Sequence, residues 1–260
     1  MTKKITSISL AVVLLVAAFA TVVSAASTVV VTPSNTEGWS TSDTRPGGAV
    51  NYVVDATSPY PGEALQLITN SSTTAKAQYM HAASTTLSSV TELSYYAKQV
   101  SGPIYADPSY QLAVDLNGAT TGGFTTFVYE PYQNGVITPG VWQQWDVDAG
   151  QMWSSRSFTE GTCAVVAGGG GAPFYTLAGL QATCPNAVVI GFGVNIGSNN
   201  PSYDVYADGV VFNETTYDFE AEYTPAPTGP VSKDDCKNGG WESFTNPSFK
   251  NQGQCVSSVN

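Results

Sequence analysis

Short apolar or alternating runs of strand length, separated by glycine, proline and polar turn residues, recur along most of this chain. They are rich in Val, Ile, Thr, Tyr and Phe, which suit a pleated and half-buried surface. The runs cover residues 50–54, 64–68, 93–97, 110–116, 124–129, 143–147, 188–194 and 205–212. No window has a sustained apolar stripe of helical period, and only residues 175–180 carry a short helical pattern. The sequence therefore predicts an all-β fold, and at this length a jelly-roll β-sandwich.

The N-terminal segment, residues 1–25, has the pattern of a signal peptide. Lys3 and Lys4 are followed by an uncharged apolar run at 8–23 and by small residues ending at Ala25, after which cleavage is expected. The alternative is a retained membrane anchor, but the run is short of the roughly 20 residues of a spanning helix. The next basic residue is Arg45. We therefore predict a secreted or cell-surface protein, with no membrane insertion after cleavage.

The mature chain divides into three parts. Residues 26–223 contain all of the expected strands and form the jelly-roll unit. Residues 224–231 include three prolines, which predicts an extended, semi-rigid linker. Residues 232–260 form a short tail that is too small to bury a core unaided.

The four cysteines fit an exported chain in which thiols pair. The natural pairs are Cys163 with Cys184 and Cys236 with Cys255. Each would close a loop of about 20 residues and stabilise the fold by roughly 3 kcal/mol. A zinc site is the alternative, but the chain has one histidine and no C-x-x-C pair. The second pair would staple the tail.

The acidic balance of the chain limits its partners. The net charge is −11, and it becomes −13 when Lys3 and Lys4 leave with the signal peptide. A chain of this charge is repelled by phosphate backbones, so nucleic acid is excluded as a partner.

Few residues are equipped for catalysis. His81 is the one histidine, and no G-x-S-x-G or H-E-x-x-H motif is present. Asp218, Glu220 and Glu222 alternate, so on a strand they would share one face, either as a catalytic carboxylate set or as the solvated face of an edge strand. A non-catalytic protein is favoured. The alternative is a carboxylate-dependent glycan-cleaving enzyme, which requires two acids about 5–10 Å apart in an open groove.

Aromatic residues make the stronger case for a binding site. Trp142, Trp145 and Trp153 fall within a dozen residues, and two tyrosines lie just upstream. A sugar ring can stack on such rings, but Trp and Tyr are also common in sandwich cores. Trp142 and Trp145 are three apart, so on a regular strand they would face opposite sides. The predicted carbohydrate-binding residues are Tyr129, Tyr132, Trp142, Trp145, Asp146 and Trp153.

The predicted partner is a polysaccharide or a cell-surface component. A structural or interaction protein, displayed on the cell surface and attached through its tail, is the alternative function. A structural calcium ion is the one cofactor considered, because Asp208 in a late strand could meet Glu37 or Asp43 from the start of the unit. No EF-hand spacing is present.

Two parts of the chain resemble known families. The first part contains the strings WSTSDTRPGG (39–48), LSY (93–95), FVYEPY (127–132), VWQQWD (141–146), WSSR (153–156), GVNIGS (193–198) and YDFE (217–220). Through these strings, residues 36–222 resemble a family of uncharacterised secreted bacterial jelly-roll (β-sandwich) domains. The tail, with CKNGGW (236–241) and FKNQGQCV (249–256), resembles a C-terminal module of many secreted bacterial proteins. Neither family has an assigned activity, so the resemblance implies fold and location only. The first unit is also similar in architecture to carbohydrate-binding jelly rolls.

Overall fold

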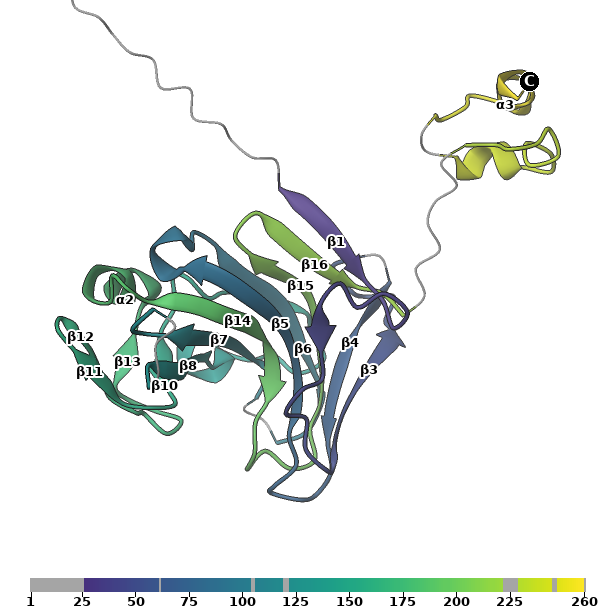
Figure 1. The fold of residues 1–260 in the computed structure, drawn as a ribbon. Coiled ribbons are helices and arrows are strands. Elements are labelled where there is room, and N and C mark those ends of the chain that lie inside the picture. The colour runs from purple at the N-terminus through teal and green to yellow at the C-terminus, as the bar shows by residue number, and fades with distance from the viewer. Residues whose placement is uncertain are drawn as a thin grey trace, which may run out of the picture.

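The structure is a computed structural model that describes residues 26–60, 62–103, 106–118, 122–221, 229–244 and 247–259. The expected signal peptide, most of the expected linker and Glu222 lie outside the described residues. Two seven-stranded sheets, both strongly curled, make up the described part of residues 26–221 (Figure 1). The predicted all-β fold of the jelly-roll, β-sandwich class is confirmed.

Sheet A joins strands from both ends of the unit. Its order is β1, β16, β15, β4, β3, with β6 on the other side of β15 and β9 beyond β6. The strands are β1 (Ser27–Val31), β3 (Gly48–Val54), β4 (Glu63–Thr69), β6 (Leu93–Ser101), β9 (Gln143–Asp146), β15 (Asp204–Phe212) and β16 (Thr215–Phe219). The β1–β16 pairing is parallel, and the other pairings are antiparallel.

Strand β15 is the centre of sheet A because it pairs with three strands. Along one edge it pairs with β6; along the other, residues 204–207 pair with β4 and residues 210–212 pair with β16. The fork falls at Asp208 and Gly209, where the backbone bulges and Gly209 has a φ of 54°. A Cβ on Gly209 would lie 2.2 Å from the Tyr60 ring, so this position requires glycine.

Sheet B is antiparallel throughout, in the order β13, β10, β8, β7, β14, β5, β2. The strands are β2 (Trp39–Ser40), β5 (Ala77–Thr86), β7 (Ser109–Asp115), β8 (Phe124–Tyr129), β10 (Met152–Ser154), β13 (Phe174–Tyr175) and β14 (Val188–Ile196). A separate hairpin is formed by β11 (Phe158–Glu160) and β12 (Cys163–Val165). Figure 1 shows this hairpin beyond the β10–β13 side of sheet B.

Alternation along the strands decides which side chains fill the core. On β7, Tyr110, Leu112 and Val114 are buried between the two sheets, whereas Ser109 and Gln111 point to the opposite face. Sheet B therefore has an apolar inner face and a polar outer face, and the outer face is where a ligand could bind.

The described helical segments are short. They are η1 (Leu87–Ser89), α1 (Pro131–Asn134), α2 (Leu177–Thr183), η2 (Gly240–Ser243) and α3 (Gln252–Ser258). The expected helical turn near residues 175–180 is present as α2, and it is capped by Thr176, whose Oγ1 accepts from the Gly179 N–H at 3.1 Å. None of the described helices is long and apolar enough to span a bilayer.

Both expected disulfides are present, Cys163–Cys184 and Cys236–Cys255. The first ties β12 to the end of α2. The second lies in the tail, where Cys236, Phe244 and Cys255 form a small buried cluster of their own with Trp241 and Phe249 packed against it. The tail thus has the staple that its size requires.

Candidate functional site: a groove on the outer face of sheet B

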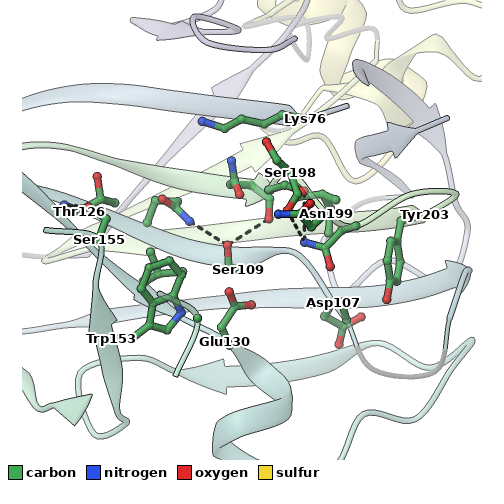
Figure 2. A pocket seen from close by; sticks show the side chains of 18 of the residues that line it. Lys76, Asp107, Ser109, Thr126, Glu130, Trp153, Ser155, Ser198, Asn199 and Tyr203 are labelled. Carbon is green, nitrogen blue, oxygen red and sulfur yellow. Dashed lines mark hydrogen bonds between the residues drawn. The ribbon is translucent and has the colours of Figure 1, made fainter. Parts of the chain in front are cut away.

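A groove of about 640 Å³ lies on the outer face of sheet B. It is lined from β7, β8, β10 and β14 and by the segments that follow β8 and β14. Figure 2 shows Trp153 and Tyr203 on opposite sides of the view, with Glu130 and Asp107 facing Lys76 and Ser198. The volume is in the range of small-ligand sites, roughly 300–1,000 Å³.

Aromatic side chains from two neighbouring segments form one wall. Trp153 extends from β10, and Tyr132 extends from α1, where 43% of it is exposed. The α1 turn also holds the glycine loop at the rim, because Gln133 Nε2 donates to the Gly170 carbonyl at 2.8 Å. Gly169 and Gly170 line the groove with bare backbone.

Hydrogen bonds fix the polar floor. Gln111 Nε2 donates to Ser109 Oγ at 2.9 Å, and Ser109 Oγ donates to the Asn195 carbonyl at 3.1 Å (Figure 2). Asn195 Nδ2 donates to Gln78 Oε1 at 3.1 Å. The floor is therefore organised before any ligand arrives.

Two carboxyl groups lie in the groove. Burial raises the pKa of Glu130 to about 7, and the neighbouring Trp153 indole acts in the opposite direction. Asp107 is only 1% exposed, and neither of its carboxylate oxygens has a hydrogen-bond partner among the described residues. Burial raises its pKa to about 7 as well, against the opposing effect of the Trp145 indole.

Two basic side chains line the facing wall, but both already have a partner. Lys76 forms an ion pair with Asp43, and the Nε of Arg45 lies 3.6 Å from the same carboxylate. Arg45 also donates to Ser198 Oγ at 2.9 Å. Asp43, which lies outside the groove, thus pairs with both cations.

The six predicted carbohydrate-binding residues do not all lie in one site. Trp153 and Tyr132 line the groove. Tyr129 and Trp145 are packed in the core, at 2% and 6% exposure. Trp142 lies on the outer face of sheet A, where its indole N–H donates to Asp55 at 3.2 Å and the Lys98 ammonium lies over its ring. Trp142 and Trp145 do lie on different faces, as their spacing indicated.

Asp146 lies outside the groove, and it lines a second, separate hollow together with Tyr129 and Trp145. It is exposed at the end of β9, beside Asp148 and Glu92. Burial, together with the hydrogen bond and charge of Asp146, raises the pKa of Asp148 to about 6. The acidic patch formed by these three residues has no aromatic side chain in its lining.

The acids considered for calcium have separate partners. Asn35 Nδ2 donates to Glu37, Asp43 pairs with Lys76, and Asp208 accepts from Ser58 and from the backbone N–H groups of Gly209 and Phe219. Within the described ranges, no group of three or more His, Cys, Asp or Glu side chains is placed to hold a metal ion.

The alternating acids near the end of the unit are not on a solvated edge strand. Strand β16 lies between β1 and β15, and Asp218 and Glu220 are 5% and 8% exposed. The expectation of a solvated edge is wrong because the sequence does not show that β1 adds to β16. Neither acid lines the groove.

His81 serves packing. It lies on β5 among the rings of Trp39, Phe192 and Tyr217, and its Nε2 is 3.0 Å from the Glu37 carbonyl.

Most of the groove was missed from the sequence. Asp107 and Tyr203 lie in loops with no motif around them, and Asn195 lies near the end of β14 in the string GVNIGS, to which the resemblance assigns no site. The one available signal was on β7, where Ser109 and Gln111 are polar positions in an otherwise apolar run.

Comparison with known proteins shows that the fold of this chain is similar to that of some solved structures. No family model and no curated protein matches the sequence. Among solved structures, the chain is similar to the family 11 carbohydrate-binding module of the cellulosomal cellulase Lic26A-Cel5E of Clostridium thermocellum. The identity is 12%, the match covers 72% of this chain and 91% of that one, and the TM-score is 0.40.

A second similar structure comes from the same organism. It is the endo-1,4-β-D-xylanase 10B with its CBM22-1 and GH10 modules, complexed with xylohexaose, at 12% identity and a TM-score of 0.35. The match covers 76% of this chain and 28% of that chain. These scores are too low to support an argument about function, so the function is argued from the groove alone.

Proposed function

We propose that this protein is a secreted, non-catalytic module that binds a polysaccharide in the groove of sheet B. The observation that carries the proposal is the pairing of an aromatic wall, Trp153 and Tyr132, with a pre-organised polar floor. A sugar ring presents an apolar C–H face and a rim of hydroxyls. The wall suits the face, and the floor suits the rim.

Pre-organisation supports the proposal. Ser109 and Gln111 are held by hydrogen bonds within β7 and to β14, and Asn195 is held by a hydrogen bond to Gln78 on β5. A ligand would therefore not have to order these side chains itself, which reduces the entropic cost of binding.

The test is depletion and affinity electrophoresis on a panel of soluble and insoluble polysaccharides. Trp153→Ala should lower the affinity for the bound polysaccharide about tenfold or more, equivalent to ~1.4 kcal/mol. Trp142→Ala is the matched control, because it removes the same side chain from the outer face of the other sheet. The proposal fails if no polysaccharide binds or if Trp153→Ala binds as well as the unchanged protein.

A glycan-cleaving enzyme is the second candidate, favoured by the presence of Asp107 and Glu130 in one groove with pKa values near 7. Against it, both oxygens of Asp107 are shielded from solvent, whereas the reaction requires both acids to reach the substrate in an open groove. We expect no release of reducing ends from any polysaccharide that binds. Release that disappears in Glu130→Gln would establish the enzyme instead.

A further inference from the structure

Several hydrogen-bond donors on the floor of the groove already have protein partners, whereas several acceptors remain for a ligand. One amide hydrogen of Gln111 and one of Asn195 are committed to protein acceptors, and the Ser109 hydroxyl donates to a backbone carbonyl. The carboxyl of Glu130 and the side-chain carbonyl oxygens of these amides are acceptors. Each amide keeps a second hydrogen, so the surplus of acceptors comes from the carboxyl of Glu130, which hydroxyl donors of a ligand can satisfy.

The charges of the groove point in the same direction. The carboxyls of Glu130 and Asp107 have no cationic partner among the described residues, whereas Lys76 and Arg45 share Asp43. With both carboxyls ionised, Glu130, Asp107 and the neighbouring Asp43 carry three negative charges. Lys76 and Arg45 carry two positive charges. A ligand carboxylate would meet uncompensated negative charge at the floor and already-paired cations at the wall.

We infer that the groove selects uncharged glycans over uronic acid polymers, and that Glu130 accepts hydroxyls of the bound sugar. This inference rests on the proposed function, because it specifies the ligand class of the same groove. Neutral sugars are rich in hydroxyl donors and carry no charge to be repelled. Like-charge contact in a partly desolvated groove opposes the binding of uronate.

The inference is tested by calorimetric titration at pH 8, where both carboxyls are largely ionised. The neutral probes are soluble β-glucan, xylan and galactomannan, and the acidic probes are polygalacturonate and alginate. The unchanged protein should bind at least one neutral probe about tenfold or more tightly than either acidic probe. Binding of an acidic probe as tightly as the best neutral probe overturns the inference.

The role of Glu130 is tested with Glu130→Gln, which removes the charge and keeps the shape. We expect affinity for the neutral probe to fall about fivefold to tenfold, because a charge-assisted acceptor is lost. Glu160→Gln is the matched control, since it makes the same charge change at an exposed position of β11 away from the groove. Equal affinity of Glu130→Gln and Glu160→Gln overturns the assignment, and thermal unfolding of both variants verifies the fold.

The results separate this inference from the proposed function. If an acidic probe binds as tightly as the best neutral probe and Trp153→Ala abolishes that binding, the groove binds glycans and the neutral selectivity is wrong. If no probe binds, the proposed function itself fails, together with the inference. The selectivity of the unchanged protein does not depend on any variant folding.

Discussion

Asp107 combines deep burial with an unsatisfied carboxyl. Both of its oxygens are shielded and unpartnered among the described residues, and burial raises its pKa to about 7. Such a group reduces the stability of the fold when it is ionised, because the nearby Trp145 indole offsets only part of the lost hydration.

Asp107→Asn should therefore stabilise the protein at pH 8. The folded-state pKa is raised above the ordinary value of 3.8, so the contribution of Asp107 to stability is complete below about pH 4 and is lost as the pH rises through 7. We expect a gain on the order of 2 kcal/mol at pH 8 and little change at pH 4, measured by urea unfolding.

The control for this prediction is Glu160→Gln, which changes the same charge at an exposed site. It should leave stability within about 0.5 kcal/mol of the unchanged protein. A loss of stability in Asp107→Asn at pH 8 would show instead that the carboxylate has a stabilising partner.

The sequence identified the right residue types but could not assign them to faces. Trp145 and Trp153 are equivalent as patterns, yet Trp145 points into the core from sheet A and Trp153 points outward from sheet B. The face that a strand buries depends on which sheet it joins, and that pairing is set by residues far away in the chain.

At the scale of elements, acids from three strands meet where β15 forks. Asp208 on β15, Asp218 on β16, Glu63 on β4 and Glu220 just after β16 interact with one another. Burial, then the neighbouring Glu63 and Asp218, raise the pKa of Glu220 to about 8. Burial raises the pKa of Asp208 to about 7, although Ser58 and two backbone N–H groups oppose this.

This fork should loosen at alkaline pH. A carboxyl with a raised folded-state pKa contributes stability below its unfolded pKa of about 4.5, and that stability is lost as the pH rises through about 8. The melting temperature should therefore fall between pH 5 and pH 9 by scanning calorimetry. Glu220→Gln should flatten this slope, whereas Glu160→Gln should keep it.

The opposite result would contradict this account of the fork. If the melting temperature rises from pH 5 to pH 9, or if Glu220→Gln has the slope of the unchanged protein, the pKa values of the acids at the fork are not raised as described.

The positions of most strands could be predicted from the local alternation of apolar and polar residues. The pairing of the strands could not be predicted in this way. The run at 205–212 was predicted as a strand, but its pairing with β4 and β6 joins residues over one hundred positions apart. The acids of β16 looked solvated in the sequence because the covering strand, β1, comes from the other end of the unit.

At the scale of the whole molecule, the tail is built to fold around its own disulfide. Its buried cluster consists of Cys236, Phe244 and Cys255, separate from the core of the sandwich. We propose that the tail serves attachment or pairing at the cell surface, and that the groove works without it.

Deletion of residues 232–260 should therefore leave the affinity for a bound polysaccharide unchanged, as measured by calorimetric titration. The same deletion should release the protein from the cell surface into the medium, followed by immunoblotting of both fractions. Unchanged surface retention would count against the role of the tail, and a loss of affinity would show that the groove depends on it.

The central claim is that a glycan binds in the groove of sheet B, and the five tryptophans of the chain allow a direct test. Each indole N–H gives one signal in a ¹H–¹⁵N correlation spectrum, so titration with the best polysaccharide fragment reports on the groove, the core and the outer face of sheet A at once. We predict that the Trp153 signal shifts most and that the Trp142 signal stays in place. A shift confined to Trp142, or no shift at a concentration that saturates binding, would contradict the claim.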